Sequence, residues 1–324
     1  DWAKDPARID VPYAVKVAAI GDIHGSFHEL AASLECLGMA KVADAEKMTL
    51  TWTGGKDLLV FTGDFTDRGK YTREVYEAVM DLEQQAAKAG GRVIALFGNH
   101  EALLLNGQVE KWANTLKPPK KQHYQNTIDS FTKAGLDFHQ AISPKGKVGA
   151  WIRRRPIVAV VNGFLFVHGG LPSPARSLSD ITADFQEGLD AEAFSKGIFM
   201  EEKGPLWHRE WWNDQALVED NLQRMGVRGV VFGHTIGALG TEGEIACIGD
   251  RVINIDIGMC PTYGNSKGGG LLITIEKNGQ MQFTAKYPDR PEKDLMKVPA
   301  PVVPAVCPRP RPANEVLPRT GTGG

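Results

Sequence analysis

The sequence contains five short motifs in which Asp, Asn or His stands beside glycine, and these side chains can hold a divalent cation or contact a phosphate oxygen. Each motif lies at or just beyond the end of an apolar run. Any one alone would be weak evidence, but chance is a poor explanation for five in this order. Together they predict a centre in which two metal ions hydrolyse a phosphate ester. The motifs are Gly21–Gly25 (GDIHG), Gly63–Gly69 (GDFTDRG), Gly98–Glu101 (GNHE), His168–Gly170 (HGG) and Gly233–Thr235 (GHT).

Six side chains of these motifs are the expected metal ligands. Mixed carboxylate and imidazole donors suit a borderline cation such as Mn²⁺, Fe²⁺/Fe³⁺ or Zn²⁺, and a carboxylate has two oxygens with which to bridge two cations. Two cations about 3.5–4 Å apart can lower the pKa of a shared water, and the resulting hydroxide would attack phosphorus without a covalent intermediate. The expected ligands are Asp22, His24 and Asp64 for the first cation, and Asp64, Asn99, His168 and His234 for the second.

Four further residues could complete the reaction. The planar guanidinium of Arg68 matches the geometry of a phosphate, and Arg209 is a candidate for a second contact. His100 is expected to protonate the leaving oxygen, with Asp67 holding its ring. Asp256 follows another apolar run, and is expected to be either a turn carboxylate or a support for the ligands.

The elements around the first three motifs follow a β-α-β-α-β order. Apolar runs at 15–20, 58–62 and 92–97 predict buried strands, and each ends at a motif. Helical spacing over 27–37 and 72–89 predicts the helices between them. Because open α/β sheets place their sites at the carboxyl ends of strands, the motifs are expected to converge there.

The second half of the sequence is rich in hairpins. Asn162-Gly163, Gly249-Asp250 and Asn278-Gly279 are typical hairpin turns between apolar runs, and a further strand over 227–232 leads to His234. Residues 107–150 are expected to form a helical insert over the site, and 180–225 to be mostly helical. Two mixed sheets packed face to face with helices outside, an α/β fold, accommodate both halves.

The predicted catalytic domain spans residues 14–290. A Pro-rich tail over 291–324 is expected to be disordered or to lie on the surface. Its Leu317–Gly321 (LPRTG) segment matches the sortase recognition pattern, but no apolar span follows, which favours a tag or a chance match. Because Asp1 and not Met comes first, we expect that a leader was removed or the chain was trimmed.

Composition argues against several classes of protein. The formal net charge of −2 does not favour binding to nucleic acid. The Arg153–Arg155 run is expected to be a solvated loop. No run of 18 apolar residues predicts a membrane span, so we expect a soluble protein, either cytoplasmic or exported after loss of a leader. None of the four cysteines forms a CxxC pair, which argues against a disulfide scaffold or a structural zinc site.

The five motifs resemble those of the calcineurin-like metallophosphoesterases. The DRG and GNHE forms resemble the phosphoprotein phosphatase branch, and Arg154–Ile157, Phe166–Leu171 and Gly204–Arg209 are most similar to its bacterial and Shewanella-like members. The resemblance covers roughly residues 15–287. It implies a four-layer αββα sandwich, a dinuclear Mn, Fe or Zn centre, and hydrolysis of phosphoserine and phosphothreonine esters, sometimes of phosphotyrosine. It also supports the roles given to Asp67, Arg68, His100 and Arg209.

Departures from the family pattern leave the metal ligands untouched. No Arg precedes Gly98-Asn99, Thr66 replaces the usual Val, and the SAPNYCG loop of eukaryotic members is absent. No second histidine follows His234 in a GHxH pattern, which disfavours a phosphodiesterase. The sequence therefore predicts a phosphomonoesterase acting on phosphoproteins or phosphopeptides. One alternative is a hydrolase of small phosphates such as diadenosine tetraphosphate, and another is a non-catalytic phosphate-binding protein.

Overall fold

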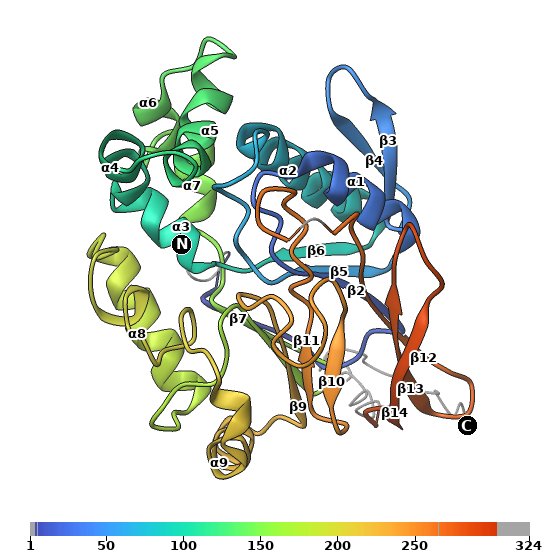
Figure 1. Ribbon diagram of the computed structural model, residues 1–324. Coiled ribbons are helices and arrows are strands. Elements are labelled where there is room, and N and C mark those ends of the chain that lie inside the picture. Colours follow the sequence, from blue (N-terminus) through green and yellow to red (C-terminus); the bar gives the residue numbers. More distant parts are fainter. Residues whose placement is uncertain (1–3, 5, 265, 303–324) are drawn as a thin grey trace, which may run out of the picture.

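The computed structural model describes residues 4, 6–264 and 266–302 of the chain. Two six-stranded sheets pack face to face, with helices on their outer sides (Figure 1). This arrangement confirms the predicted four-layer sandwich. The LPRTG segment and the rest of the tail over 303–324 lie outside the described residues.

One sheet contains the three parallel strands that lead to the first three motifs. In sheet order its strands are β14 (Lys293–Pro299), β13 (Gln280–Lys286), β12 (Gly270–Ile275), β2 (Lys16–Ile20), β5 (Leu58–Phe61) and β6 (Arg92–Ala95). β2, β5 and β6 are parallel neighbours and almost completely buried, as expected of strands covered on both faces. β12 and β13 form the predicted antiparallel pair.

The other sheet carries the last two motifs. In order it consists of β1 (Arg8–Val11), β7 (Val158–Val161), β8 (Phe164–Val167), β9 (Gly229–Phe232), β11 (Val252–Asn254) and β10 (Ala246–Ile248). The predicted hairpins β7–β8 and β10–β11 are both antiparallel. β8 and β9 are parallel, so His168 and His234 follow strands that run in the same direction. Phe164 of β8 contacts Phe283 of β13 at 4.9 Å between ring centres, where the two sheets face each other.

Helices cover the sheets and form the insert. α2 ends as predicted, because Gly90 adopts the left-handed conformation with a φ of 81°. The predicted insert over 107–150 contains α4 to α7, seen in green in Figure 1. None of the described helices is both long and apolar enough to cross a membrane. The helices are α1 (Phe27–Cys36), α2 (Thr72–Ala89), α3 (Asn99–Leu105), α4 (Gln108–Thr115), α5 (Lys120–Thr132), α6 (Phe138–Ile142), α7 (Lys147–Ile152), α8 (Leu178–Asp190) and α9 (Gln215–Met225).

The structure extends the predicted domain at both ends. β14 pairs antiparallel with β13, so residues 293–299 are not disordered but lie on the surface as an edge strand, the second of the two predicted alternatives. The strand buries Val298 on an edge where flanking prolines are tolerated, which is why composition alone concealed it. At the other end β1 adds a parallel edge strand beside β7, outside the predicted limit of residue 14.

Two other predictions need correction. Residues 180–225, expected to be mostly helical, contain α8 and α9, but the segment over 191–214 between them consists largely of turns and two short 3-10 helices. The Arg153–Arg155 run is not a solvated loop, because Arg155 is buried, forms an ion pair with Glu83 and stacks over Trp151. A hairpin of β3 (Ala40–Asp44) and β4 (Thr49–Trp52) was not predicted.

Candidate metal centre

Five loops bring the predicted ligands to one place. Asp22 follows β2, Asp64 follows β5, and Asn99 is the first residue of α3 after β6. The other sheet contributes His168 after β8 and His234 after β9. Within each sheet these strands are parallel neighbours, so their carboxyl ends lie together.

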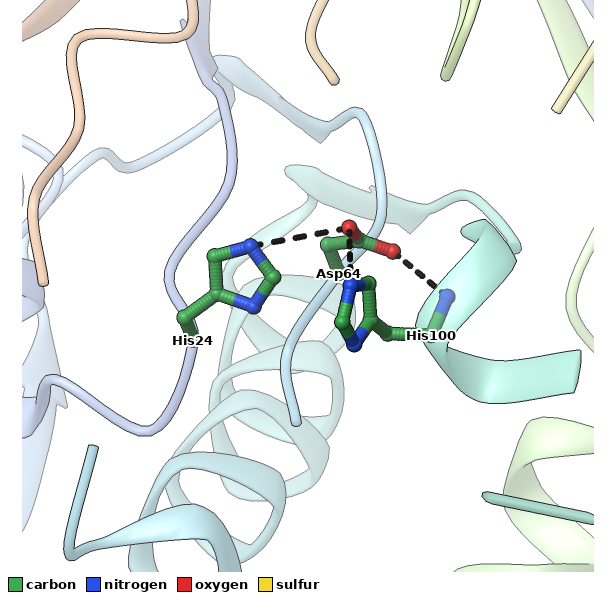
Figure 2. A group of neighbouring side chains, drawn as sticks. All are labelled: His24, Asp64 and His100. Atoms are coloured by element: carbon green, nitrogen blue, oxygen red, sulfur yellow. Dashed lines mark hydrogen bonds and ion pairs between the residues drawn. The ribbon is translucent and has the colours of Figure 1, made fainter. Parts of the chain in front are cut away.

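Asp64 lies between two groups of imidazoles. Its Oδ2 atom is 3.6 Å from His24 Nε2 and 4.0 Å from His100 Nε2, and its Oδ1 atom is 3.3 Å from His168 Nε2. Figure 2 shows the rings of His24 and His100 next to each other, both facing the same oxygen of the Asp64 carboxylate. Two sets of side chains, His24–Asp64–His100 and Asp64–His168–His234, each have ligand atoms within 4.8 Å of one another. Because Asp64 belongs to both sets, its carboxylate could bridge two cations.

Asp22 lies beside the first group. Its Oδ2 atom is 3.9 Å from His24 Nε2, and its Oδ1 atom accepts the backbone N–H of His234 at 2.9 Å. Asp22 therefore links the loops after β2 and β9. The predicted first site of Asp22, His24 and Asp64 thus comes together, with His100 as an additional neighbour that the sequence assigned to proton transfer.

Backbone carbonyls orient two of the imidazoles. His24 Nδ1 lies 2.8 Å from the carbonyl oxygen of Thr66, and His168 Nδ1 lies 2.9 Å from that of Thr62. A carbonyl only accepts hydrogen bonds, so each Nδ1 carries a proton. Each Nε2 is then directed at Asp64, which is the arrangement that metal-binding histidines adopt.

Two features of the second group fit a bound cation: one short contact and one nitrogen without a partner in the described part of the chain. His168 Nε2 lies 2.7 Å from Asn99 Oδ1, and two acceptor atoms at this distance repel unless a proton or a cation lies between them. His234 Nε2 is buried with no hydrogen-bond partner among the described residues, which is costly for a polar atom. Burial lowers the pKa of His24 and of His234 well below the usual range, so both stay neutral, the form that binds metals.

The buried carboxylates also require positive charge. Burial, reinforced by Asp256 and Asp64, raises the pKa of Asp22 well above its usual value, and burial raises that of Asp256 to about 6. Burial opposes a charge on His168, yet Asp64 and Asp22 outweigh it and raise its pKa to about 9. A divalent cation would stabilise the carboxylates of Asp22 and Asp256 in their ionised form. Asp256 accepts the N–H of Gly258, as a turn carboxylate does, and its charge acts on Asp22, so it is also a neighbour of the ligands.

Strained backbone conformations are concentrated at this centre. His24, Asp64, Asp67, Arg68 and His234 all have φ values between 48° and 70°, a region that non-glycine residues rarely adopt. Each such residue costs on the order of 1–3 kcal/mol, and it persists only where its surroundings hold it in place. The strain therefore indicates that neighbouring contacts fix these loops.

Glu101 provides several of those contacts, although no role was predicted for it. Its buried carboxylate accepts the backbone N–H groups of Asp64, Phe65 and Gly98 at 2.9–3.0 Å, and the hydroxyl of Tyr76 at 3.0 Å. It thus joins the loop after β5 to the start of α3. The signal in the sequence is its position three residues after Gly98, where a helix N-terminus favours an acidic residue.

The residues expected to act on the ester lie beside the first group. Asp67 Oδ2 is 2.6 Å from His100 Nδ1, and Arg68 Nη2 is 3.2 Å from His100 Nε2. The ring of Tyr263, from the loop between β11 and β12, covers the Arg68 guanidinium with 3.7 Å from Cζ to the ring centre. Tyr263 is 42% exposed, so this contact lies at the mouth of the site. It was not predicted, because loop residues 261–264 carry no motif.

Arg209 lies on the opposite side of the centre. It is exposed, and its Nη1 donates to Thr235 Oγ1 at 3.0 Å. Its charge is the third contribution, after burial and His168, to the low pKa of His234. Arg209 is therefore close enough to the second group to contact an anion bound there.

The chain matches the model of the calcineurin-like phosphoesterase family over residues 15–237. It is 27% identical to Shewanella-like protein phosphatase 2 of Arabidopsis thaliana, covering 84% of this chain and 78% of that protein. It is 30% identical to Shewanella-like protein phosphatase 1 of Plasmodium berghei, covering 68% and 61%. A crystal structure of a cold-active protein-tyrosine phosphatase of a psychrophilic Shewanella species shares the fold, with a TM-score of 0.69 at 23% identity over 90% of this chain and 82% of that one.

The length of the family match establishes the relationship, and the carboxylates and imidazoles on the strand ends are what such a family requires. The chain belongs to the calcineurin-like phosphoesterase family, and within it to the phosphoprotein phosphatases of the Shewanella-like type.

Proposed function

We propose that this chain is a metal-dependent phosphatase that hydrolyses phosphomonoesters of proteins or peptides, on serine, threonine or tyrosine. The observation that carries the proposal is the position of Asp64, shared by two groups of imidazoles and next to the Arg68–His100–Asp67 contacts. Two relatives named Shewanella-like protein phosphatases support a phosphoprotein substrate.

The six predicted ligands would hold two divalent cations. Bound there, such cations would lower the pKa of a water molecule and neutralise charge on the phosphate. The donors are carboxylate oxygens, one amide oxygen and imidazole nitrogens, a set that suits Mn, Fe or Zn better than Mg or Ca. Glu101 and the carbonyls of Thr62 and Thr66 would keep the ligands oriented.

The remaining roles fall to residues around the ligands. Arg68 would bind phosphate oxygens through its guanidinium, and Arg209 would contact them from the other side. The Asp67 carboxylate holds the ring of His100 through Nδ1, which leaves Nε2 facing the site. His100 would deliver a proton from Nε2 to the oxygen of the departing alcohol.

Replacing Tyr263 should weaken substrate binding more than turnover. The ring covers one face of the Arg68 guanidinium, and a cation–π contact at an exposed site contributes about 0.5–1 kcal/mol. We therefore expect Tyr263→Ala to raise KM for p-nitrophenyl phosphate by about two- to fivefold, with a smaller change in kcat. Tyr263→Phe should keep KM close to the wild-type value, because the ring remains. Tyr13→Ala, at an exposed tyrosine between β1 and β2, is the control; equal KM values for Tyr263→Ala and wild type would contradict the contact.

A substrate panel tests the proposed function. The purified full chain, loaded with Mn²⁺ after metal analysis, would be assayed with phosphoserine, phosphothreonine and phosphotyrosine peptides, diadenosine tetraphosphate and sugar phosphates. We expect the phosphopeptides to give the highest kcat/KM. A preference for the nucleotide or the sugar phosphates would instead identify a small-molecule phosphatase. Protein that binds two metal ions but cleaves none of these compounds, nor p-nitrophenyl phosphate, would be a non-catalytic phosphate-binding protein.

A further inference from the structure

The helical insert makes direct contact with the loop that carries Asp67 and Arg68. The backbone N–H of Arg68 donates to the carbonyl oxygen of His123 at 2.8 Å, and Asn126 Nδ2 donates to the carbonyl oxygen of Arg68 at 2.8 Å. The backbone N–H of Asp67 donates to Thr127 Oγ1 at 3.1 Å. All three partners lie on α5. These contacts hold the left-handed φ values of 70° at Asp67 and 66° at Arg68.

Thr127 also contacts the Asp67 carboxylate. Its hydroxyl donates to Asp67 Oδ1 at 3.0 Å, while Asp67 Oδ2 lies 2.6 Å from His100 Nδ1. A hydroxyl has one proton to give and lone pairs to accept with, so Thr127 satisfies both the N–H and the carboxylate of Asp67. Thr127 and Asp67 are both 0% exposed, so water cannot take over either bond.

We infer that Thr127 is a positioning residue, which orients the Asp67 carboxylate and through it the His100 ring. This inference rests on the proposed function, because it concerns the proton that His100 delivers. With Oδ1 held by α5, Oδ2 is directed at Nδ1, and the opposite ring nitrogen faces the ester. The insert is in this view part of the catalytic structure and not only a cover over the site.

A purely structural role for Thr127 predicts a different pattern of activity. Loss of a proton donor slows the release of a poor leaving group much more than that of a good one. General damage to the loop or to the metal ions would slow both alike. The dependence of kcat on the leaving group therefore separates the two roles.

The variants are Thr127→Val, which keeps the shape and loses the hydroxyl, and Thr127→Ser, which keeps the hydroxyl. We expect Thr127→Val to lower kcat on a phosphoserine peptide by about ten- to a hundredfold, the usual cost of removing a supporting hydrogen bond at such a site. On p-nitrophenyl phosphate, whose phenolate leaves without a proton, the loss should be only a few fold. Thr127→Ser should restore both rates. Thr132→Val is the matched control, because Thr132 is an exposed threonine of the same helix whose hydroxyl donates to the carbonyl oxygen of Ile128.

A second measurement does not depend on turnover. The Nδ1 proton of His100, assigned by its loss in His100→Asn, should give an exchange-protected low-field signal in proton NMR of the wild type and Thr127→Ser. In Thr127→Val the signal should shift upfield or be lost through exchange. An unchanged signal together with equal losses on both esters would overturn the inference while the proposed function stands. If the wild type cleaves no ester, the proposed function and the delivery of a proton by His100 are both wrong. The Nδ1 proton signal would then still report whether Thr127 orients His100.

Discussion

Asp64→Asn should reduce turnover at least about a thousandfold. An amide presents one oxygen where the carboxylate presents two, so the variant cannot bridge two cations, and the negative charge between the imidazoles of His24, His100 and His168 is lost. A metal ion contributes several kcal/mol of transition-state stabilisation, and each 1.4 kcal/mol or so corresponds to a factor of ten in rate. The measurement is kcat on p-nitrophenyl phosphate with saturating Mn²⁺.

Metal content and thermal stability should change together with the rate. We expect about two metal ions per chain in the wild type and one or fewer in Asp64→Asn, by elemental analysis. Because a ligand that binds only the folded state stabilises it, Mn²⁺ should raise Tm of the wild type and do so less for the variant. Without metal the variant should unfold at a lower temperature than the wild type, because it loses the buried ion pair between Asp64 and His168, although Asn keeps an acceptor for the N–H of His100.

Asp57→Asn is the matched control for this substitution. Asp57 immediately precedes β5, at the opposite end of the strand that Asp64 follows, and forms an ion pair with Lys16 far from the ligands. It should leave both the rate and the metal content unchanged. A near-normal rate in Asp64→Asn would contradict the bridging role and would leave the two imidazole groups without a common ligand.

The convergence of the ligands could be predicted from the sequence because it depends on a strong local rule. Buried parallel strands such as β2 and β5 appear as continuous apolar runs, and the residue just past each run must lie at the carboxyl edge. The histidines after β8 and β9 follow the same rule in the second sheet. The place of these ligands in the fold could therefore be predicted from short segments of the sequence.

The edge strands could not be predicted in the same way. β1 and β14 each have one partner, so almost all their residues are exposed or half-buried and the apolar signal is weak. Prolines near β14 gave a composition typical of disorder, but a proline at a strand end on a sheet edge removes no necessary hydrogen bond. Pairing with β13, which no pattern within residues 293–299 signals, decided the outcome.

The residues that support the site were missed for a different reason. Thr127 acts through two hydrogen bonds with Asp67, made across 60 residues of sequence, and Tyr263 through one contact with Arg68, made across almost 200. Neither has a residue type or spacing that marks a site. Glu101 stood inside a motif, yet its four hydrogen bonds depend on how α3 packs against the loop after β5. The supporting roles of these residues can be recognised only in the three-dimensional structure.

His100 could be a metal ligand or a proton donor, and its replacement should give the second large effect on kcat. Its Nε2 atom lies 4.0 Å from Asp64 Oδ2, in a set that could hold a metal, and its Nδ1 bonds a carboxylate, as that of a metal ligand often does. However, the guanidinium of Arg68 lies 3.2 Å from the same Nε2, and a cation at this position would repel a metal ion. The neighbouring charge therefore disfavours metal binding, and we predict that His100 acts in proton transfer.

His100→Asn should consequently lower kcat by about 10²- to 10⁴-fold on a phosphoserine peptide, the usual contribution of a positioned acid. Metal content should stay at the wild-type level, and the loss on p-nitrophenyl phosphate should be much smaller, because its leaving group needs no proton. His139→Asn, at an exposed histidine of α6, is the control and should change neither quantity. If the variant instead loses metal in proportion to its activity, and kcat falls equally on both esters, His100 is a ligand of the first cation. The proton would then have to come from another group, and the bonds between α5 and Asp67 would serve to hold a metal ligand in place.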